Sequence, residues 1–163
     1  MASNIDKFKA SLPWVFSLFI AFVFVQSLFF KFSDAPETQH IFNTLNQWGS
    51  DNLGIDSLFI APGIFNQYVV GSAELVASIL LLLGLFTKHK FLNPVGALLA
   101  FGVISGAIFF HLFTPLGVVV QNDGGALFGM AVGIWISSLM LVLRGRHLLA
   151  NLLQRCCKKD TSA

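Results

Sequence analysis

Charged residues are scarce in this sequence. Asp, Glu, Lys and Arg together make up 11% of the 163 residues, whereas soluble domains contain about 25%. Hydrophobic residues make up 55% of the chain, and eighteen of them are Phe. This composition excludes an ordinary soluble domain and is typical of an integral membrane protein, so we expect contact with a lipid bilayer. The length allows one domain, which we place over residues 1–163.

Cysteine is nearly absent as well. The two cysteines, Cys156 and Cys157, are neighbours in a basic C-terminal stretch. Adjacent cysteines form neither a C-x-x-C redox motif nor a zinc-binding spacing, which argues against a thiol relay through the membrane. We interpret them as reduced thiols, and palmitoylation is the alternative because the stretch follows a membrane span.

Several functional motifs are missing too. The sequence contains no nucleophile elbow, phosphate-binding loop or dinucleotide-binding fingerprint. Its basic C-terminal tail follows a membrane span, and we expect such a tail to lie on anionic lipid. We therefore expect no nucleic-acid partner.

Four apolar stretches are each long enough for an α-helix to cross about 30 Å of hydrocarbon. The first is not followed by an A-x-A-like cleavage site at the right distance, so we interpret it as a retained helix. Pro13 is placed at the start of this helix, where its missing N–H costs nothing. The spans are expected at about 12–30, 67–86, 93–113 and 126–143, followed by a basic cytoplasmic tail at 144–163. This pattern predicts an all-α integral membrane four-helix bundle.

A short interfacial amphipathic helix is expected between the first two spans. Its start is indicated by Asp34 as N-cap, with Pro36 in the first turn and Glu37 three residues after the cap. Gly49 is expected to end it. Its apolar face consists of Ile41, Phe42, Leu45 and Trp48. The following loop is expected to fold back onto the bundle through its apolar residues, Leu58, Phe59, Ile60 and Phe65.

The basic residues indicate how the helices are oriented. Nine of the ten Lys and Arg lie in the N-terminal segment, the 87–90 turn and the C-terminal tail, and Lys31 alone lies at the opposite end of the spans. By the positive-inside rule, both termini are predicted to be cytoplasmic. The membrane that we expect is a bacterial inner membrane. Five of the eight acidic residues lie on the outer side with Lys31.

Small residues at four-residue spacing predict where membrane helices approach closely. The third span contains Gly102-x-x-x-Gly106, and the fourth contains Gly129-x-x-x-Gly133. These pairs predict a compact bundle rather than a wide pore.

Five polar residues are predicted to gather in the outer half of the bundle. Glu74 lies inside the second span, about 10 Å from its outer end, and a carboxylate within a membrane helix is a functional-site candidate. An ion pair with Lys31 is the simplest way to bury it. The other candidates lie near the outer ends of the remaining helices: Gln26, His111 and Asp123.

These five residues are candidate ligand-binding residues for a quinone, whose carbonyl oxygens need hydrogen-bond donors and whose reduction consumes protons. Glu74 and His111 are the candidates for handling those protons. The alternatives are structural: Lys31 and Glu74 pin two helices together, His111 bonds to a neighbour at the rim, and Asp123 belongs to a turn that favours the start of the last helix. We expect no metal, although one alternative site combines Glu37, His40, His111 and Asp123.

At these residues the chain resembles the DoxX family of small four-helix membrane proteins, over about residues 12–143. The segments that carry the resemblance are Leu28-Phe29-Phe30-Lys31-Phe32, Ala35-Pro36-Glu37-Thr38, Gly71-Ser72-Ala73-Glu74-Leu75, Gly106-Ala107-Ile108-Phe109-Phe110-His111-Leu112 and Gln121-Asn122-Asp123-Gly124-Gly125.

The resemblance implies this fold, with Lys31 and Glu74 as the shared polar pair. The family is named for a relative that forms part of a thiosulfate:quinone oxidoreductase, and other members look like accessory proteins of redox complexes. It therefore implies an accessory protein or subunit of a membrane redox system, with a quinone or similar lipid-soluble ligand and a membrane or redox partner protein. Distant relatives act as membrane chaperones or cargo receptors, so the alternative is a non-catalytic scaffold or chaperone for a partner membrane protein.

Overall fold

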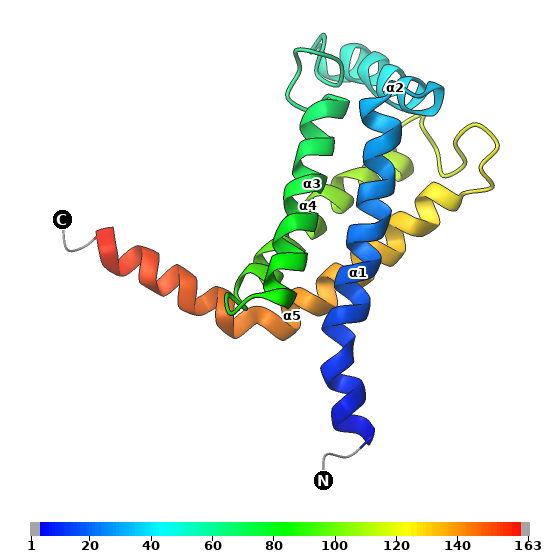
Figure 1. Cartoon of the computed structure of the whole chain (residues 1–163). Coiled ribbons are helices and arrows are strands. Elements are labelled where there is room, and N and C mark those ends of the chain that lie inside the picture. The colour runs from blue at the N-terminus through cyan, green and yellow to red at the C-terminus, as the bar shows by residue number, and fades with distance from the viewer. Residues whose placement is uncertain (1–3, 161–163) are drawn as a thin grey trace.

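A computed structural model describes the backbone of residues 4–160 and the side chains of residues 11–154. Within these residues the chain is all-helical, and four helices are long and apolar enough to cross a membrane. This confirms the predicted four spans and the shorter helix between the first two (Figure 1). The helices are α1 (Asn4–Phe32), α2 (Pro36–Leu53), α3 (Gln67–Phe86), α4 (Leu92–Phe113) and α5 (Ala126–Asp160). The predictions for Cys156 and Cys157 concern side chains outside the described ones.

The helix bounds differ from the predicted ones mainly at the chain ends. Helix α1 begins at Asn4, so Pro13 lies inside the helix rather than at its start. The polar residues before the apolar span continue the helix, although Pro13 removes one backbone hydrogen bond from it. Helix α5 continues past the predicted end of the span to Asp160, because no proline interrupts the basic tail.

The four spanning helices pack around one core. Helix α4 lies between α3 and α5, and α1 packs against α3 and α5. The core side chains come from all four helices, and they include Phe24, Leu81, Ala97 and Ile134. The side chains that face away from this core are largely apolar too, as expected for helices surrounded by lipid.

Glycine allows close helix approach, but not at most of the predicted positions. A Cβ at Gly96 would lie 2.7 Å from the backbone nitrogen of Leu81, so this glycine lets α4 lie against α3. By contrast, a Cβ at Gly102, Gly106 or Gly129 would meet nothing within 4 Å. The predicted Gly102–Gly106 contact was therefore wrong, because this pair faces outward from the bundle.

One end of the bundle is covered, and we call it the capped end. Helix α2 lies across it (Figure 1), and the buried Phe42 and Leu45 pack with Phe59, Leu116 and Val120 of the two long connections. This confirms that the loop after α2 folds back onto the bundle. The predicted end of α2 at Gly49 was wrong, because the helix runs to Leu53 and ends with Gly54 in the left-handed conformation. Gly49 instead lies against the ring of Phe59.

The opposite end, which we call the basic end, contains the turn between α3 and α4. The described N-terminal part of α1 extends beyond it, and the last part of α5 leaves the bundle there (Figure 1). The segments that carry nine of the ten Lys and Arg therefore all lie at this end.

Candidate functional site

The predicted ion pair forms near the capped end, between α1 and α3. The Lys31 ammonium donates to both carboxylate oxygens of Glu74, at 3.1 Å to Oε1 and 3.0 Å to Oε2. The two side chains are 15% and 7% exposed. Burial of a charge in a membrane helix is costly, and the bidentate contact offsets that cost by leaving the pair neutral overall.

Ser27 forms hydrogen bonds with both members of the ion pair. Ser27, one helical turn before Lys31 on α1, donates to Glu74 Oε2 at 3.0 Å and accepts a hydrogen bond from the Lys31 ammonium. Gly71 lies one turn before Glu74 on α3, where a Cβ would be 3.4 Å from the Lys31 stem and from the side chain of Leu28. The missing side chain at Gly71 therefore lets α1 approach α3 closely enough for the Lys31 ammonium to reach Glu74.

A second group of polar side chains lies just past the end of α1 and is centred on Asp34. Oδ1 of Asp34 accepts hydrogen bonds from the Tyr68 hydroxyl at 2.9 Å, from Gln39 at 3.2 Å and from Gln67. Gln67 also donates to the backbone carbonyl of Lys31 at 2.9 Å. The prediction of Asp34 as N-cap of α2 was wrong: the N-cap position is Ala35, and the Asp34 carboxylate joins α3 to the end of α1.

His111 lies in a separate cluster at the capped end. Its side chain is buried, with 8% exposure, and Nδ1 lies 2.6 Å from the carbonyl oxygen of Gly117. Because a carbonyl only accepts, Nδ1 bears a proton and donates it to this oxygen. The ring also packs edge-on against Phe128 of α5. The structure therefore agrees with the rim histidine bonded to a neighbour.

Asp123 anchors the connection between α4 and α5. Its carboxylate accepts from the backbone N–H groups of Leu127 at 2.9 Å, Gly125 at 2.8 Å and Val120 at 2.9 Å. These three bonds, together with the charge of nearby His111, lower the pKa of the Asp123 carboxyl group below its ordinary value. This agrees with the interpretation of Asp123 as part of a turn that favours the start of the last helix.

The five sequence candidates therefore do not form one cluster. Lys31 and Glu74 are in contact, His111 and Asp123 lie together at the α4–α5 connection, and Gln26 is exposed on α1. No hydrogen bond or ion pair joins the two clusters within the described side chains. In the same part of the chain, no three His, Cys, Asp or Glu side chains are grouped closely enough to hold a metal ion, so the four-residue metal site is not assembled.

Ser27 and Gln67 were not among the predicted site residues, but their spacing along the helices indicates both. Gln67, Gly71, Glu74 and Ser78 share one face of α3 at spacings of four, three and four residues, and all four are buried. A stripe of polar and small residues along an otherwise apolar span marks the face that packs against another helix. Ser27 is four residues before Lys31, so it shares the face of α1 that meets this stripe.

The comparison with protein families matches residues 14–113 to DoxX. The match covers α2, α3, α4 and most of α1, and thus includes Lys31, Glu74 and His111 but not Asp123 or α5. No curated protein and no solved structure matches the chain. Because the matched segment is more than half of the chain, this four-span membrane protein belongs to the DoxX family.

Proposed function

We propose that this protein is an accessory subunit of a membrane redox system and that a quinone or similar lipid-soluble carbonyl compound binds at Lys31 and Glu74. The observation that carries the proposal is the partly buried contact of an ammonium, a carboxylate and a hydroxyl between two apolar spans. Lys31 supplies N–H donors for a carbonyl oxygen, and Glu74 holds a proton acceptor beside it. DoxX membership supports the redox context.

In this proposal the ligand replaces the hydrogen bond between Lys31 and Ser27. The Lys31 ammonium turns from Ser27 to a ligand carbonyl while it keeps Glu74, so no charge is left unpaired. The Phe32 ring is 50% exposed at this level and packs beside Tyr68, with 5.9 Å between ring centroids, which offers an aromatic surface for a flat ring. His111 keeps its bond to Gly117, and we assign it no contact with the ligand.

The test is the quinone content of detergent-purified protein, measured by mass spectrometry of its organic extract. We expect about one quinone per chain in the wild type and at least a tenfold lower content in Glu74→Gln, where the carboxylate is lost. The control is Gln26→Leu, which changes a polar residue of α1 that is exposed and makes no described hydrogen bond. Equal quinone contents in all three proteins, or none in any of them, would contradict the proposal.

A scaffold for a partner membrane protein is the second candidate, and two observations favour it. Every buried polar side-chain atom in the described residues has a hydrogen-bond partner inside the chain, so the pair needs no ligand to be stable. In addition, Gly102 and Gly106 face outward with open space around them, which suits the close approach of a partner helix.

A double variant separates these candidates. Removal of one partner of a buried ion pair costs about 3–5 kcal/mol, whereas replacement of both by apolar residues is often neutral. We therefore expect Lys31→Met to lower the thermal stability of the protein and Lys31→Met/Glu74→Leu to restore it. If the double variant is stable and still supports its redox system, the pair is a structural pin and the scaffold is the better proposal. If it is stable but inactive and lacks quinone, the ligand site stands.

A further inference from the structure

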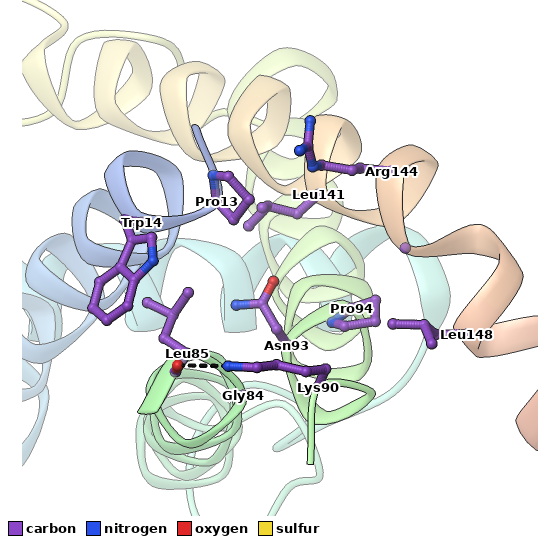
Figure 2. A pocket seen from close by; sticks show the side chains of 11 residues that line it. Pro13, Trp14, Gly84, Leu85, Lys90, Asn93, Pro94, Leu141, Arg144 and Leu148 are labelled. Atoms are coloured by element: carbon purple, nitrogen blue, oxygen red, sulfur yellow. Dashed lines mark hydrogen bonds between the residues drawn. The ribbon is translucent and has the colours of Figure 1, made fainter. Parts of the chain in front are cut away.

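The basic end contains a cavity that the proposed function does not use. It has a volume of about 320 Å³ and lies among the first half of α1, the end of α3, the start of α4 and the middle of α5. Figure 2 shows Trp14 on one side and Pro94 and Leu148 on the other, with Leu141 beside Arg144 and with Lys90 at the opposite wall. The cavity thus combines apolar walls with two cations from different elements.

The two cations have no acidic partner in this cavity. The Lys90 ammonium donates to the backbone carbonyl of Leu85 at 2.9 Å, which holds it at the wall (Figure 2). Arg144 is exposed and makes no hydrogen bond or ion pair with any described side chain. The sequence has no Asp or Glu between Leu75 and Asn122, nor between Gly124 and Lys159. The segments that form most of this wall therefore leave a net positive charge that an anion would neutralise.

The shape of the cavity is fixed by the start of α4. The Asn93 amide donates to the Ser17 hydroxyl at 2.8 Å and to the Leu81 carbonyl at 3.1 Å, which ties this turn to α1 and α3. Gly145 lets α5 pass directly against the ring of Pro94. The first turn of α4 has no acidic residue and no capping side chain, so its partial positive charge adds to that of the cations.

An apolar hollow adjoins this cavity. It has a volume of about 300 Å³ and lies between α1 and α5, and it shares Pro13, Leu141 and Arg144 with the first cavity. Its other lining residues are entirely apolar: Leu12, Phe16, Met140 and Leu143. Arg144 therefore lies where a charged cavity meets a hydrocarbon-like hollow, which is the arrangement that an amphiphilic anion requires.

The depth of the cavity identifies the membrane surface as the source of that anion. The cavity lies where α3 ends and α4 begins, and the apolar span of α1 starts at Ser11, beside it. Trp14 packs edge-on against Phe86 with 5.1 Å between ring centroids, and Trp is typical of the membrane–water interface. We propose that this cavity binds one anionic phospholipid, with its phosphate between Lys90 and Arg144 and an acyl chain in the adjoining hollow.

Native mass spectrometry of the detergent-purified protein tests this proposal, with phosphatidylglycerol, phosphatidylcholine of the same chain length and inorganic phosphate as probes. We expect one retained phosphatidylglycerol per chain and weaker retention of the other two. Arg144→Gln and Lys90→Gln should each weaken phosphatidylglycerol binding by about fivefold. The matched controls are Arg146→Gln and Lys88→Gln, which remove the same charge from neighbouring residues that do not line the cavity; they should bind like the wild type.

A variant of the hollow tests the site without a change of charge. Met140→Trp fills the apolar hollow and should weaken phosphatidylglycerol binding while all cations remain, with folding checked by size-exclusion chromatography. Equal losses in the cavity variants and their controls would overturn the proposal, since they would indicate general attraction to a basic tail. Equal retention of phosphatidylcholine, or tight binding of inorganic phosphate, would likewise overturn it.

Discussion

At the scale of single residues, the Asp123 carboxylate ties together the turn that precedes α5. It accepts from three backbone N–H groups, and these bonds lower its pKa in the folded protein below the ordinary value of 3.8. A lowered folded pKa contributes stability above the ordinary value, and this contribution is lost as the pH falls through the folded pKa. The start of α5 is therefore held in place at neutral pH.

We predict that Asp123→Asn lowers the melting temperature by about 2–4 °C near neutral pH, because the amide lacks the second acceptor oxygen that binds the Leu127 N–H. The difference from the wild type should shrink as the pH falls from 3.8, the ordinary pKa, through the lowered pKa of the folded wild-type carboxyl group. Thermal unfolding of both proteins over an acidic pH series measures it. A difference that does not change with pH would show that the charge of Asp123 is not what stabilises the turn.

Residue pairs were only partly predictable from the sequence. The Lys31–Glu74 pair could be predicted because a buried carboxylate needs a cation, and Lys31 is the one Lys or Arg in the sequence that lies toward that end of the spans. The role of Asp34 could not be predicted, since its position two residues before Pro36 also fits an N-cap. The outcome depended on Gln67 and Tyr68, which the fold brings to Asp34 from 33 and 34 residues away.

At the scale of helices, two of the three glycines of α4 have opposite surroundings. Gly96 packs against the backbone of α3, where a Cβ would lie 2.7 Å from the Leu81 nitrogen and 2.9 Å from the Ala77 oxygen, whereas Gly102 has open space around it. We predict that Gly96→Ala destabilises the bundle by about 1–3 kcal/mol through overpacking. Gly102→Ala should be neutral or raise stability by up to about 1 kcal/mol, since alanine favours the helix.

Unfolding of both variants in mixed detergent–denaturant solution measures this difference. Similar losses in both would mean that Gly102 has a packing partner, such as a second chain. The comparison also explains why helix packing was harder to predict than helix position. Apolar length alone gave the bounds of α3, but glycine spacing cannot tell a helix face that meets another helix from one that meets lipid.

At the scale of the whole molecule, the two ends of the bundle differ in charge, and α2 lies across only one of them (Figure 1). The capped end has the acidic connections and is covered by α2, and the basic end has the free helix ends and the turn between α3 and α4. The sequence predicts which end faces the cytoplasm, because basic loops are retained there during insertion. The sequence does not predict that α2 covers the capped end, because this depends on contacts between α2 and the two long connections.

The orientation is testable by cysteine labelling in whole cells. In a background with Cys156→Ser and Cys157→Ser, we predict that Asp56→Cys at the capped end reacts with a membrane-impermeant maleimide added outside the cell membrane. Lys88→Cys, in the turn at the basic end, should react only after that membrane is lysed. Both residues are exposed, so access to the reagent is limited by the membrane and not by the fold. The reverse pattern would place the basic end outside, and it would require a reason why nine basic residues were translocated against the positive-inside rule.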